Sequence, residues 1–174
     1  NPIEMEGTYS LPEAQLDRFL LKLDVPFPSF NELRDIGTLT TGKALPDIKT
    51  VMSRETLLAL QDLVREVVVA PHVADAAAHL TIATHPEHKD ASPLVKRFVR
   101  YGASPRAMQA LLLAGRAAAL LDGRAWVGVD DLYAVCHPIL RHRMILSFDA
   151  ELDGVTSDKL VDEVIDSVKK RITA

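Results

Sequence analysis

The sequence contains few of the features that mark secreted or membrane-spanning proteins. It has one cysteine, Cys136, in 174 residues, which excludes an internal disulfide framework and fits a reducing compartment. Arg116 interrupts the most hydrophobic stretch, so no apolar run reaches the roughly 20 residues of a membrane span. The first residues show no signal-peptide pattern. We therefore expect a cytoplasmic protein.

An excess of positive charge is also missing. The 20 Lys and Arg are outnumbered by 24 Asp and Glu, which gives a net charge of −4, and the two signs are interspersed. Nonspecific binding to nucleic acid or to anionic membranes needs a basic face, so the composition argues against both. The remaining composition, 48% hydrophobic and 25% charged, is typical of a soluble globular chain. The length suits one domain, or a small domain joined to part of another.

Helical periodicity dominates the chain from Ser53 onward. Leu57, Leu60 and Leu63 share one face of the first helix, and Pro71 starts a second. Further helices are expected to begin at Pro93, after a cap at Ser104, after a cap at Asp130, and after a cap near Thr156 or Ser157. Pro138 is expected to end or kink the helix that follows Asp130. The pattern predicts a bundle of helices.

Strand signals are scarce. Leu21, Leu23 and Val25 alternate with polar residues, which predicts a strand ending at Pro26, and the other short candidates are 125–129 and 144–148. An isolated strand pair is marginal in water, so the pattern points to a missing sheet. The opening at Asn1, without methionine, leads us to expect part of a longer protein. We expect residues 27–46 to be a boundary stretch with at most a short helix around Glu32.

The segment 101–124 carries the longest helix signal and an unusually placed charge. Ser104 suits the cap, Pro105 suits the first helical position, and Gly123 suits the stop. The predicted packed face consists of Met108, Leu111, Leu112, Ala118 and Leu121, with Gly115 allowing close approach of a neighbour. Arg106 falls in the first turn, where helix N–H groups favour an anion. Residue chemistry alone leaves two interpretations of Arg106, a surface cation and a phosphate ligand.

Two motifs suggest sites that the surrounding residues do not support. Residues 37–43 match the phosphate-loop spacing GxxxxGK, but no buried strand precedes them, Ala44 lacks the hydroxyl that holds magnesium, and Pro46 interrupts the following turn. Six histidines suggest zinc, but no four-ligand set has the usual spacing. No base is placed beside Cys136 for nucleophilic catalysis. We expect no bound metal and no self-sufficient catalytic site.

The motifs NPIEMEGTY, LPEAQLDRF, GASPRA and LRHRM, in this order, resemble the MoxR family of AAA+ ATPases. The resemblance covers nearly the whole chain. It implies a mostly α-helical fold, with a helical AAA+ lid bundle preceded by a short remnant of a P-loop type α/β ATPase core. The implied divisions are 1–28 for the core remnant, 29–50 for a linker and 51–174 for the lid.

The resemblance also implies roles for three residues. Asn1 takes the sensor 1 role and orients the attacking water near the γ-phosphate. Arg18, in LDRF, is the arginine finger that reaches the nucleotide of a neighbouring subunit. Arg106, in GASPRA, is sensor 2 and contacts the γ-phosphate from the lid. These roles suit the chemistry, because arginine stays charged and binds phosphoryl oxygens bidentately, and asparagine both donates and accepts hydrogen bonds.

The resemblance further implies an ATP- and Mg²⁺-dependent ring, hexameric, which remodels or matures other proteins beside partners with a von Willebrand A domain. The family's phosphate loop and magnesium-binding acidic motif do not occur in these 174 residues. We therefore expect the chain by itself to bind no nucleotide tightly and to be inactive. The alternative function is a non-enzymatic helical binding module, such as a helix-turn-helix domain with 144–154 as a wing, although the acidic net charge weighs against nucleic acid.

Overall fold

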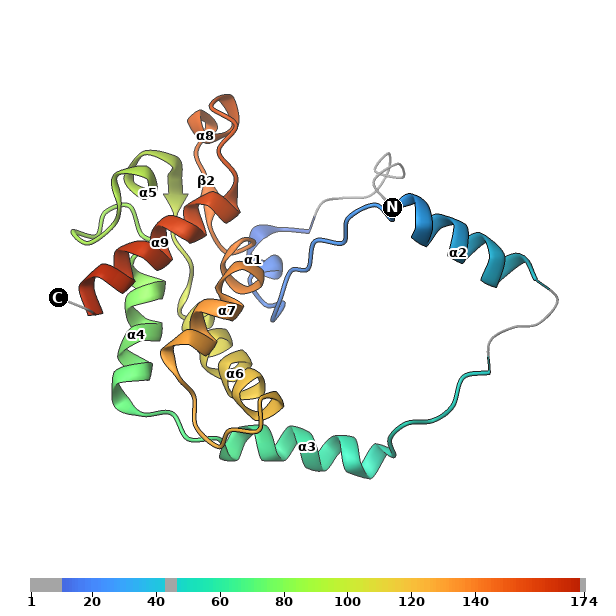
Figure 1. Ribbon diagram of the computed structural model, residues 1–174. Helices are drawn as coiled ribbons and strands as arrows, with labels where there is room; N and C mark the ends of the chain where they lie inside the picture. Colours follow the sequence, from blue (N-terminus) through green and yellow to red (C-terminus); the bar gives the residue numbers. More distant parts are fainter. Residues whose placement is uncertain (1–10, 43–46, 173–174) are drawn as a thin grey trace. The chain divides into compact units, whose positions relative to one another are not determined.

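The structure, a computed structural model, describes residues 11–42 and 47–172, and its regular elements are nearly all helices (Figure 1). In chain order they are α1 (Glu13–Leu16), α2 (Phe30–Thr41), α3 (Arg54–Glu66), α4 (Pro71–Ile82), α5 (Pro93–Phe98), β1 (Val99–Tyr101), α6 (Pro105–Leu121), α7 (Val129–Leu140), β2 (Ile145–Leu146), α8 (Phe148–Leu152) and α9 (Ser157–Ile172). The predicted mostly α-helical fold is confirmed. No helix in the described ranges is both long and apolar enough to cross a membrane.

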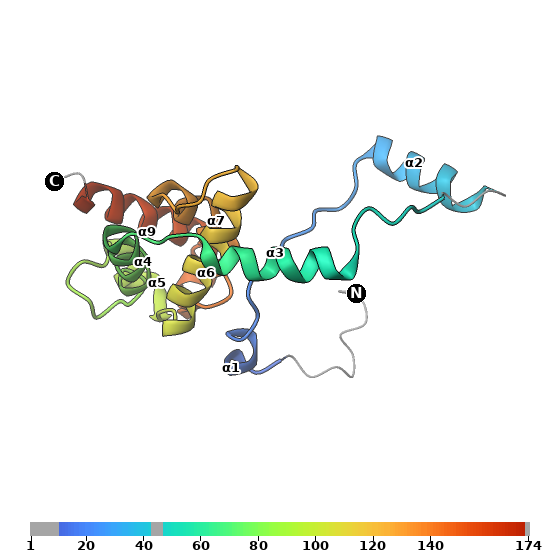
Figure 2. The ribbon, with the colours of Figure 1, turned by 90° about the horizontal axis from the view of Figure 1, so that it is seen from below.

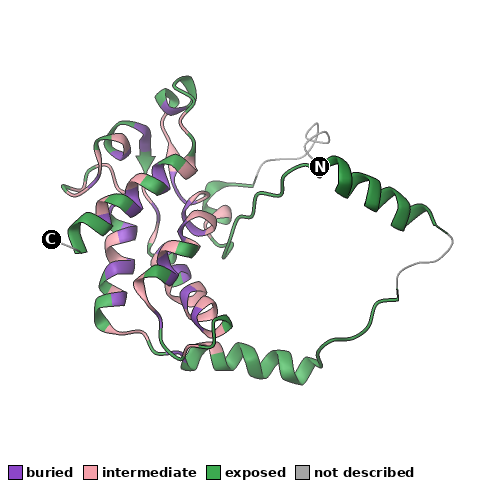
Figure 3. Cartoon of the chain, in the orientation of Figure 1, coloured by how far each residue is buried: buried purple, intermediate pink, exposed green. Residues whose placement is uncertain are grey.

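The chain divides into two compact units. One contains the N-terminal segment up to Lys22 together with Val64–Ala174, and the other is Leu23–Leu63. Figure 3 shows that the buried residues gather in the helices from α4 onward, whereas α2 and α3 are exposed along their length. Neither α2 nor α3 contains a buried residue.

The core of the larger unit is built by four long helices. α6 packs against α7 and α4, and α9 packs against the same two helices. Figures 1 and 2 both show α6 and α7 side by side. The largest fully buried side chains are Leu80, Leu111, Leu132, Ile139, Leu140 and Leu160. Helical periodicity therefore predicted the elements of this core correctly.

The buried face of α6 differs from the predicted one. Its buried residues are Ala107, Ala110, Leu111, Gly115 and Ala119. Leu121, which we expected to pack, is 88% exposed, and Met108 and Leu112 are only partly buried. Small residues face the neighbours because the helices approach closely, and a Cβ at Gly115 would lie 3.0 Å from Leu132. The predicted close approach at Gly115 is thus confirmed, while the predicted leucine-rich face is shifted.

The boundary stretch contains a longer helix than we expected. α2 runs from Phe30 to Thr41, whereas we expected at most a short helix around Glu32. The side chain of Ser29 accepts a hydrogen bond from the Glu32 amide, and the Glu32 carboxylate accepts one from the Ser29 amide at 2.7 Å. This reciprocal capping box satisfies two amides at the helix start and explains why the helix forms there.

The predicted strand at 21–25 is wrong. Residues 21–29 form no helix or strand, and the Lys22 amide instead donates to the Pro138 carbonyl at 2.8 Å. Alternation of apolar residues makes a strand only when a second strand supplies hydrogen bonds, and no described strand pairs with this segment. The described two-stranded sheet pairs β1 with β2 antiparallel, while Trp126 forms one isolated bridge with Val68.

The start and the proline of α7 also differ from the sequence prediction. Gly128, not Asp130, occupies the cap position, and its amide donates to the Asp131 carboxylate at 2.7 Å. Pro138 does not end the helix, which continues to Leu140. Proline removes one helical hydrogen bond, and the complete burial of Ile139 and Leu140 beyond it offsets that loss. Capping of α9 by Thr156 is confirmed, since its hydroxyl accepts from the Lys159 amide at 3.3 Å.

Candidate functional site

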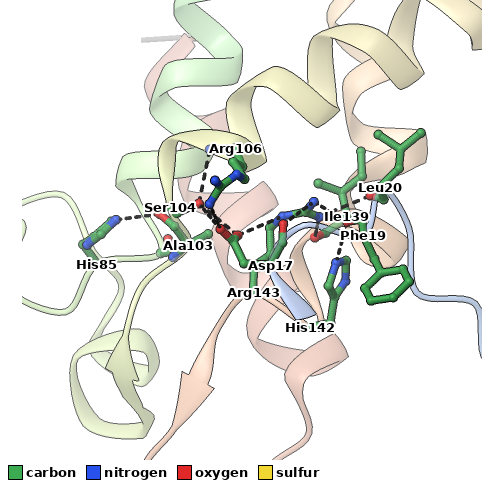
Figure 4. Close-up of polar contacts among 11 residues, drawn as sticks. Asp17, Phe19, Leu20, His85, Ala103, Ser104, Arg106, Ile139, His142 and Arg143 are labelled. Atoms are coloured by element: carbon green, nitrogen blue, oxygen red, sulfur yellow. Dashed lines mark hydrogen bonds and ion pairs between the residues drawn. The ribbon is translucent and has the colours of Figure 1, made fainter. Parts of the chain in front are cut away.

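The first turn of α6 presents Arg106 as the sequence predicted. The Ser104 hydroxyl caps the helix by accepting from the Arg106 amide at 3.2 Å, and Pro105 occupies the first helical position. The Arg106 side chain is half exposed, and its guanidinium donates to the Asp17 carboxylate at 3.0 Å. The cation is therefore held by a carboxylate from the N-terminal segment (Figure 4).

Two residues that follow α4 hold Ala103, the residue before the α6 cap. The Ala103 amide donates to the buried Thr84 hydroxyl at 2.9 Å, and the ring nitrogen Nε2 of His85 lies 2.9 Å from the Ala103 carbonyl, to which it donates. Gly102 is required beside them, because a Cβ there would lie 2.6 Å from the His85 ring. These contacts hold the residue before the α6 cap against the segment that follows α4.

Asp17 is the acidic centre of the site. Both of its carboxylate oxygens accept from the Ser104 hydroxyl, at 2.9 and 2.8 Å, and one also accepts from Arg106. Arg143 Nε lies 3.4 Å from the other oxygen. Partial burial alone would raise the pKa of Asp17, but the hydrogen bonds from Ser104 and Arg106 and the charge of Arg143 lower it below its ordinary value. Asp17 is therefore ionised at neutral pH.

Arg143 is the buried cation of the site, with a side chain only 2% exposed. Its terminal amino groups donate to four main-chain carbonyls, those of Ile139 at 2.5 Å, Asp17 at 3.2 Å, Phe19 at 2.5 Å and Leu20 at 3.2 Å. Burial lowers the pKa of Arg143, and Asp17 opposes that effect. The charge is thus compensated by one carboxylate and a set of carbonyl dipoles, as a buried ion requires.

His142 adds a second contact to the same segment. Its Nε2 lies 3.1 Å from the Phe19 carbonyl and donates to it. Burial lowers the pKa of His142, the hydrogen bond to Phe19 raises it, and the charges of Arg143 and Lys22 lower it further. The LRHRM motif therefore attaches the segment after α1 to the end of α7.

A cavity of about 200 Å³ lies against this network. It is lined by Asp17, Arg18, Leu20, Arg106, Gln109, Ala110, Leu113 and Arg143. Three arginines and one carboxylate give its wall a net positive charge, which favours an anion. The Arg18 side chain is exposed and has no hydrogen bond or ion pair to any residue in 11–42 or 47–172. A second cavity of about 620 Å³, on whose wall Asp17 and Arg143 also lie, extends to β2.

The structure brings two of the three predicted site residues to one cavity and leaves the third outside its range. Arg18 and Arg106 both line the 200 Å³ cavity, and Asn1 lies outside the described residues. Sequence reasoning missed Asp17 and Arg143 as site residues. Both residues stand in the quoted motifs, Asp17 in LDRF and Arg143 in LRHRM. A charged residue is rarely buried unless it is paired, but only the fold shows that these two meet.

The remaining sequence candidates have structural roles. Residues 37–41 of the GxxxxGK match lie inside α2, so their amides belong to helical hydrogen bonding, and Lys43 and Ala44 lie outside the described residues. Cys136 is fully buried, and burial raises the pKa of its thiol to about 12. Within the described ranges, no cluster of three or more His, Cys, Asp and Glu side chains has a metal-binding arrangement.

Comparison with known proteins identifies the family. Residues 91–164 match the AAA lid domain, and residues 1–21 match the ATPase family associated with various cellular activities. Chaperone MoxR1 of Mycobacterium tuberculosis is 38% identical over 168 residues, which are 97% of this chain and 44% of that protein. The chain belongs to the MoxR family of AAA+ ATPases. Arg106 thus stands at the start of a helix within the matched lid region.

Two other proteins are similar to nearly the whole chain. The uncharacterized protein YeaC of Bacillus subtilis is 36% identical over 172 residues, or 97% of this chain and 50% of that protein. The crystal structure of a putative ATPase from Cytophaga hutchinsonii superposes with a TM-score of 0.87 at 27% identity, covering 96% of this chain and 51% of that one. The chain therefore spans about half the length of the proteins that it matches.

Proposed function

We propose that this chain is the lid-bearing part of a MoxR-type ATPase that assembles into a ring and uses ATP hydrolysis to remodel or mature other proteins. The name of the relative Chaperone MoxR1 supports a chaperone-like role. In this proposal residues 1–28 belong to the α/β core, 29–50 form the linker, and 51–174 form the lid. The protein acts in the cytoplasm as a homohexamer, beside a partner with a von Willebrand A domain and without nucleic acid.

The observation that carries the proposal is the position of Arg106. It lies at the N-terminus of a 17-residue helix and already binds a carboxylate, whose oxygens resemble those of a phosphoryl group in charge and hydrogen-bonding capacity. A guanidinium fits the γ-phosphate of ATP, because it can bind two phosphoryl oxygens at once. ATP with Mg²⁺ supplies the phosphoryl group that water attacks. Arg106 binds that group from the lid, and Asn1 orients the water.

Arg18 has the second role in the proposal, acting on the nucleotide of a neighbouring subunit. Its side chain is exposed and has no partner among the described residues of its own chain, so its guanidinium is available to a second subunit. A guanidinium supplied from outside the nucleotide's own subunit stabilises the charge of the transition state and contributes about 10³ to 10⁵ in rate in known cases.

Substitution of Arg106 in the full-length protein tests the lid contact. Arg106→Ala should lower ATP turnover about 10² to 10³-fold, because one charge-assisted contact to the transition state is lost. The melting temperature should change little, since the side chain is half exposed. Arg97→Ala is the matched control, because Arg97 is also exposed and also paired with one carboxylate, that of Asp153 at 2.7 Å. Unchanged turnover with a lowered melting temperature in Arg106→Ala would contradict the proposal.

Subunit mixing tests the role of Arg18. Arg18→Ala should bind ATP nearly normally yet lose turnover. Mixed with a second mutant whose upstream phosphate loop is defective, it should regain partial activity, because some interfaces join an intact nucleotide site to an intact finger. If no activity returns at any ratio, with subunit exchange verified separately, Arg18 does not act across the interface.

A further inference from the structure

Arg143 holds the main chain on both sides of Arg18. One terminal nitrogen of its guanidinium donates to the carbonyl of Asp17 and to the carbonyl of Phe19, at 3.2 and 2.5 Å. These residues directly precede and follow Arg18. The other terminal nitrogen reaches the Leu20 carbonyl at 3.2 Å (Figure 4). The main chain around Arg18 is therefore fixed at several points by one side chain.

The guanidinium that makes these contacts is itself rigidly placed. It is almost completely buried, donates to the Ile139 carbonyl in the last turn of α7, and lies beside the Asp17 carboxylate. A planar fork of five N–H groups can satisfy several carbonyls at once, which a lysine ammonium on a flexible stem cannot do with the same geometry. Arg143 thus fixes the main chain of residues 17–20 relative to the last turn of α7.

Arg18 has no such support for its own side chain. The Arg18 side chain is exposed and forms no hydrogen bond or ion pair with a described residue. The direction in which its side chain leaves the backbone is consequently set by the peptide groups on either side, and Arg143 binds a carbonyl in each neighbouring residue. Misplacement of a reacting group by about 1 Å can lower a rate about 10²-fold, so this support matters for a group that acts by position.

We propose that Arg143 is the positioning residue of Arg18, and that its bonds to the flanking carbonyls set where the Arg18 guanidinium stands at the subunit edge. The inference rests on the proposed function, in which Arg18 acts on the nucleotide of a neighbour. Arg143 itself is buried and touches no nucleotide in this mechanism.

The test uses Arg143→Met in the full-length protein, with ATP affinity, turnover and melting temperature measured separately. The kcat should fall about 10²-fold while the dissociation constant for ATP stays close to that of the wild type. Mixing with the phosphate-loop mutant should restore partial activity, as for Arg18→Ala. Arg124→Met is the matched control, because Arg124 forms an ion pair with Asp131, at 2.6 Å, in the same unit. Arg124 forms no hydrogen bond or ion pair with residues 17–20. It should lose stability but keep its turnover below the melting transition.

The double variant Arg18→Ala, Arg143→Met separates positioning from other effects. If Arg143 acts through Arg18, the double variant should turn over as slowly as Arg18→Ala alone. The inference would be overturned if the turnover losses of the two single variants multiplied in the double variant. It would also be overturned if Arg124→Met lost as much turnover as Arg143→Met at the same fall in melting temperature. If Arg143→Met does not fold, Arg143→Lys decides, because it keeps the charge beside Asp17 but not the fork. Wild-type turnover in the lysine variant overturns the inference, and a reduced kcat with no further loss on adding Arg18→Ala supports it.

The outcomes also separate the inference from the proposed function. If Arg18→Ala keeps full turnover, the finger role itself fails. If Arg18→Ala loses turnover and the Arg143 variants do not, the finger role stands and only the positioning role is wrong.

Discussion

The helices α3 and α4 both carry apolar residues at helical spacing but differ completely in burial. Leu57, Leu60 and Leu63 of α3 are 50%, 38% and 46% exposed, whereas Val73 and Leu80 of α4 are fully buried. Periodicity identifies the apolar side of a helix, but only a neighbouring element decides whether that side is covered. The contrast extends to the whole chain, because residues 64–172 surround a core and the helices of 23–63 bury no residue.

Ion pairs show the same contrast. Arg34 and Asp35 of α2 are both more than 60% exposed, and a pair of this kind contributes about 0 to 1 kcal/mol. Arg143 and Asp17 are 2% and 16% exposed and are surrounded by further hydrogen bonds. Removing one partner of such a pair leaves the other charge buried without compensation, which is far more costly. Position in the fold, not residue type, therefore separates a structural ion pair from a surface one.

Truncation of a leucine should show the largest difference between the two regions. Leu111→Ala should lower the free energy of unfolding by about 2 to 5 kcal/mol, because it removes a fully buried side chain and leaves a cavity. Leu33→Ala in α2, where the leucine is 42% exposed, should change it by less than about 0.5 kcal/mol. Urea unfolding followed by the fluorescence of Trp126, the single tryptophan, measures both. Equal losses would mean that the face of α2 is covered in solution.

Adding a methyl group to a glycine should have opposite effects in the two regions. Gly102→Ala should destabilise the protein by about 1 to 3 kcal/mol, because the new Cβ would lie 2.6 Å from the His85 ring. Gly37→Ala in α2 meets nothing within 4 Å and should stabilise that helix by about 0.5 to 1 kcal/mol. Thermal unfolding and far-UV circular dichroism measure the two changes. A stable Gly102→Ala protein would show that His85 can move without cost.

Acid should weaken the larger unit through Asp131. Its hydrogen bonds from Arg124 lower its pKa, burial opposes them, and the Gly128 amide lowers the pKa further. Since the folded pKa lies below the unfolded value of about 3.9, this contribution is complete above that pH and is lost as the pH falls through the folded pKa. Asp131→Asn should therefore be less stable than wild type at pH 7, and the difference should shrink below about pH 4. Urea unfolding at several pH values checks this, and a constant difference would contradict it.

The bundle could be predicted from sequence because its signals are local. Ser104, Pro105 and Gly123 mark the ends of α6, and all lie where the chain needs a cap, a fixed φ or a positive φ. The strand at 21–25 could not be judged in the same way, because a strand depends on a partner that is distant in sequence. Alternation at Leu21, Leu23 and Val25 satisfies the local rule without supplying that partner.

The candidate site was predicted only in part for a related reason. Arg106 was found because its position in a helix first turn is a local signal, and Arg18 because its motif resembles that of a family. Asp17 and Arg143 are 126 residues apart, and their interaction depends on how the segment after α1 folds onto the end of α7. Neither helical periodicity nor a capping rule predicts a contact between residues so far apart in the sequence.

Removal of a helix cap should give the smallest effect and the clearest local test of the comparison. Ser29→Ala deletes the cap of α2, and Thr156→Ala deletes the corresponding hydroxyl at the start of α9. Either loss costs its helix about 1 kcal/mol. α9 contributes five buried residues to the core, so Thr156→Ala should lower the free energy of global unfolding by that amount. α2 buries none, and a 12-residue helix without tertiary packing is marginal in water, so Ser29→Ala should only speed amide hydrogen exchange within α2.

The urea midpoint of unfolding, followed by Trp126 fluorescence, should then be unchanged in Ser29→Ala and shifted in Thr156→Ala. An equal shift in both would show that α2 unfolds together with the bundle, and the contrast between the two regions would fail.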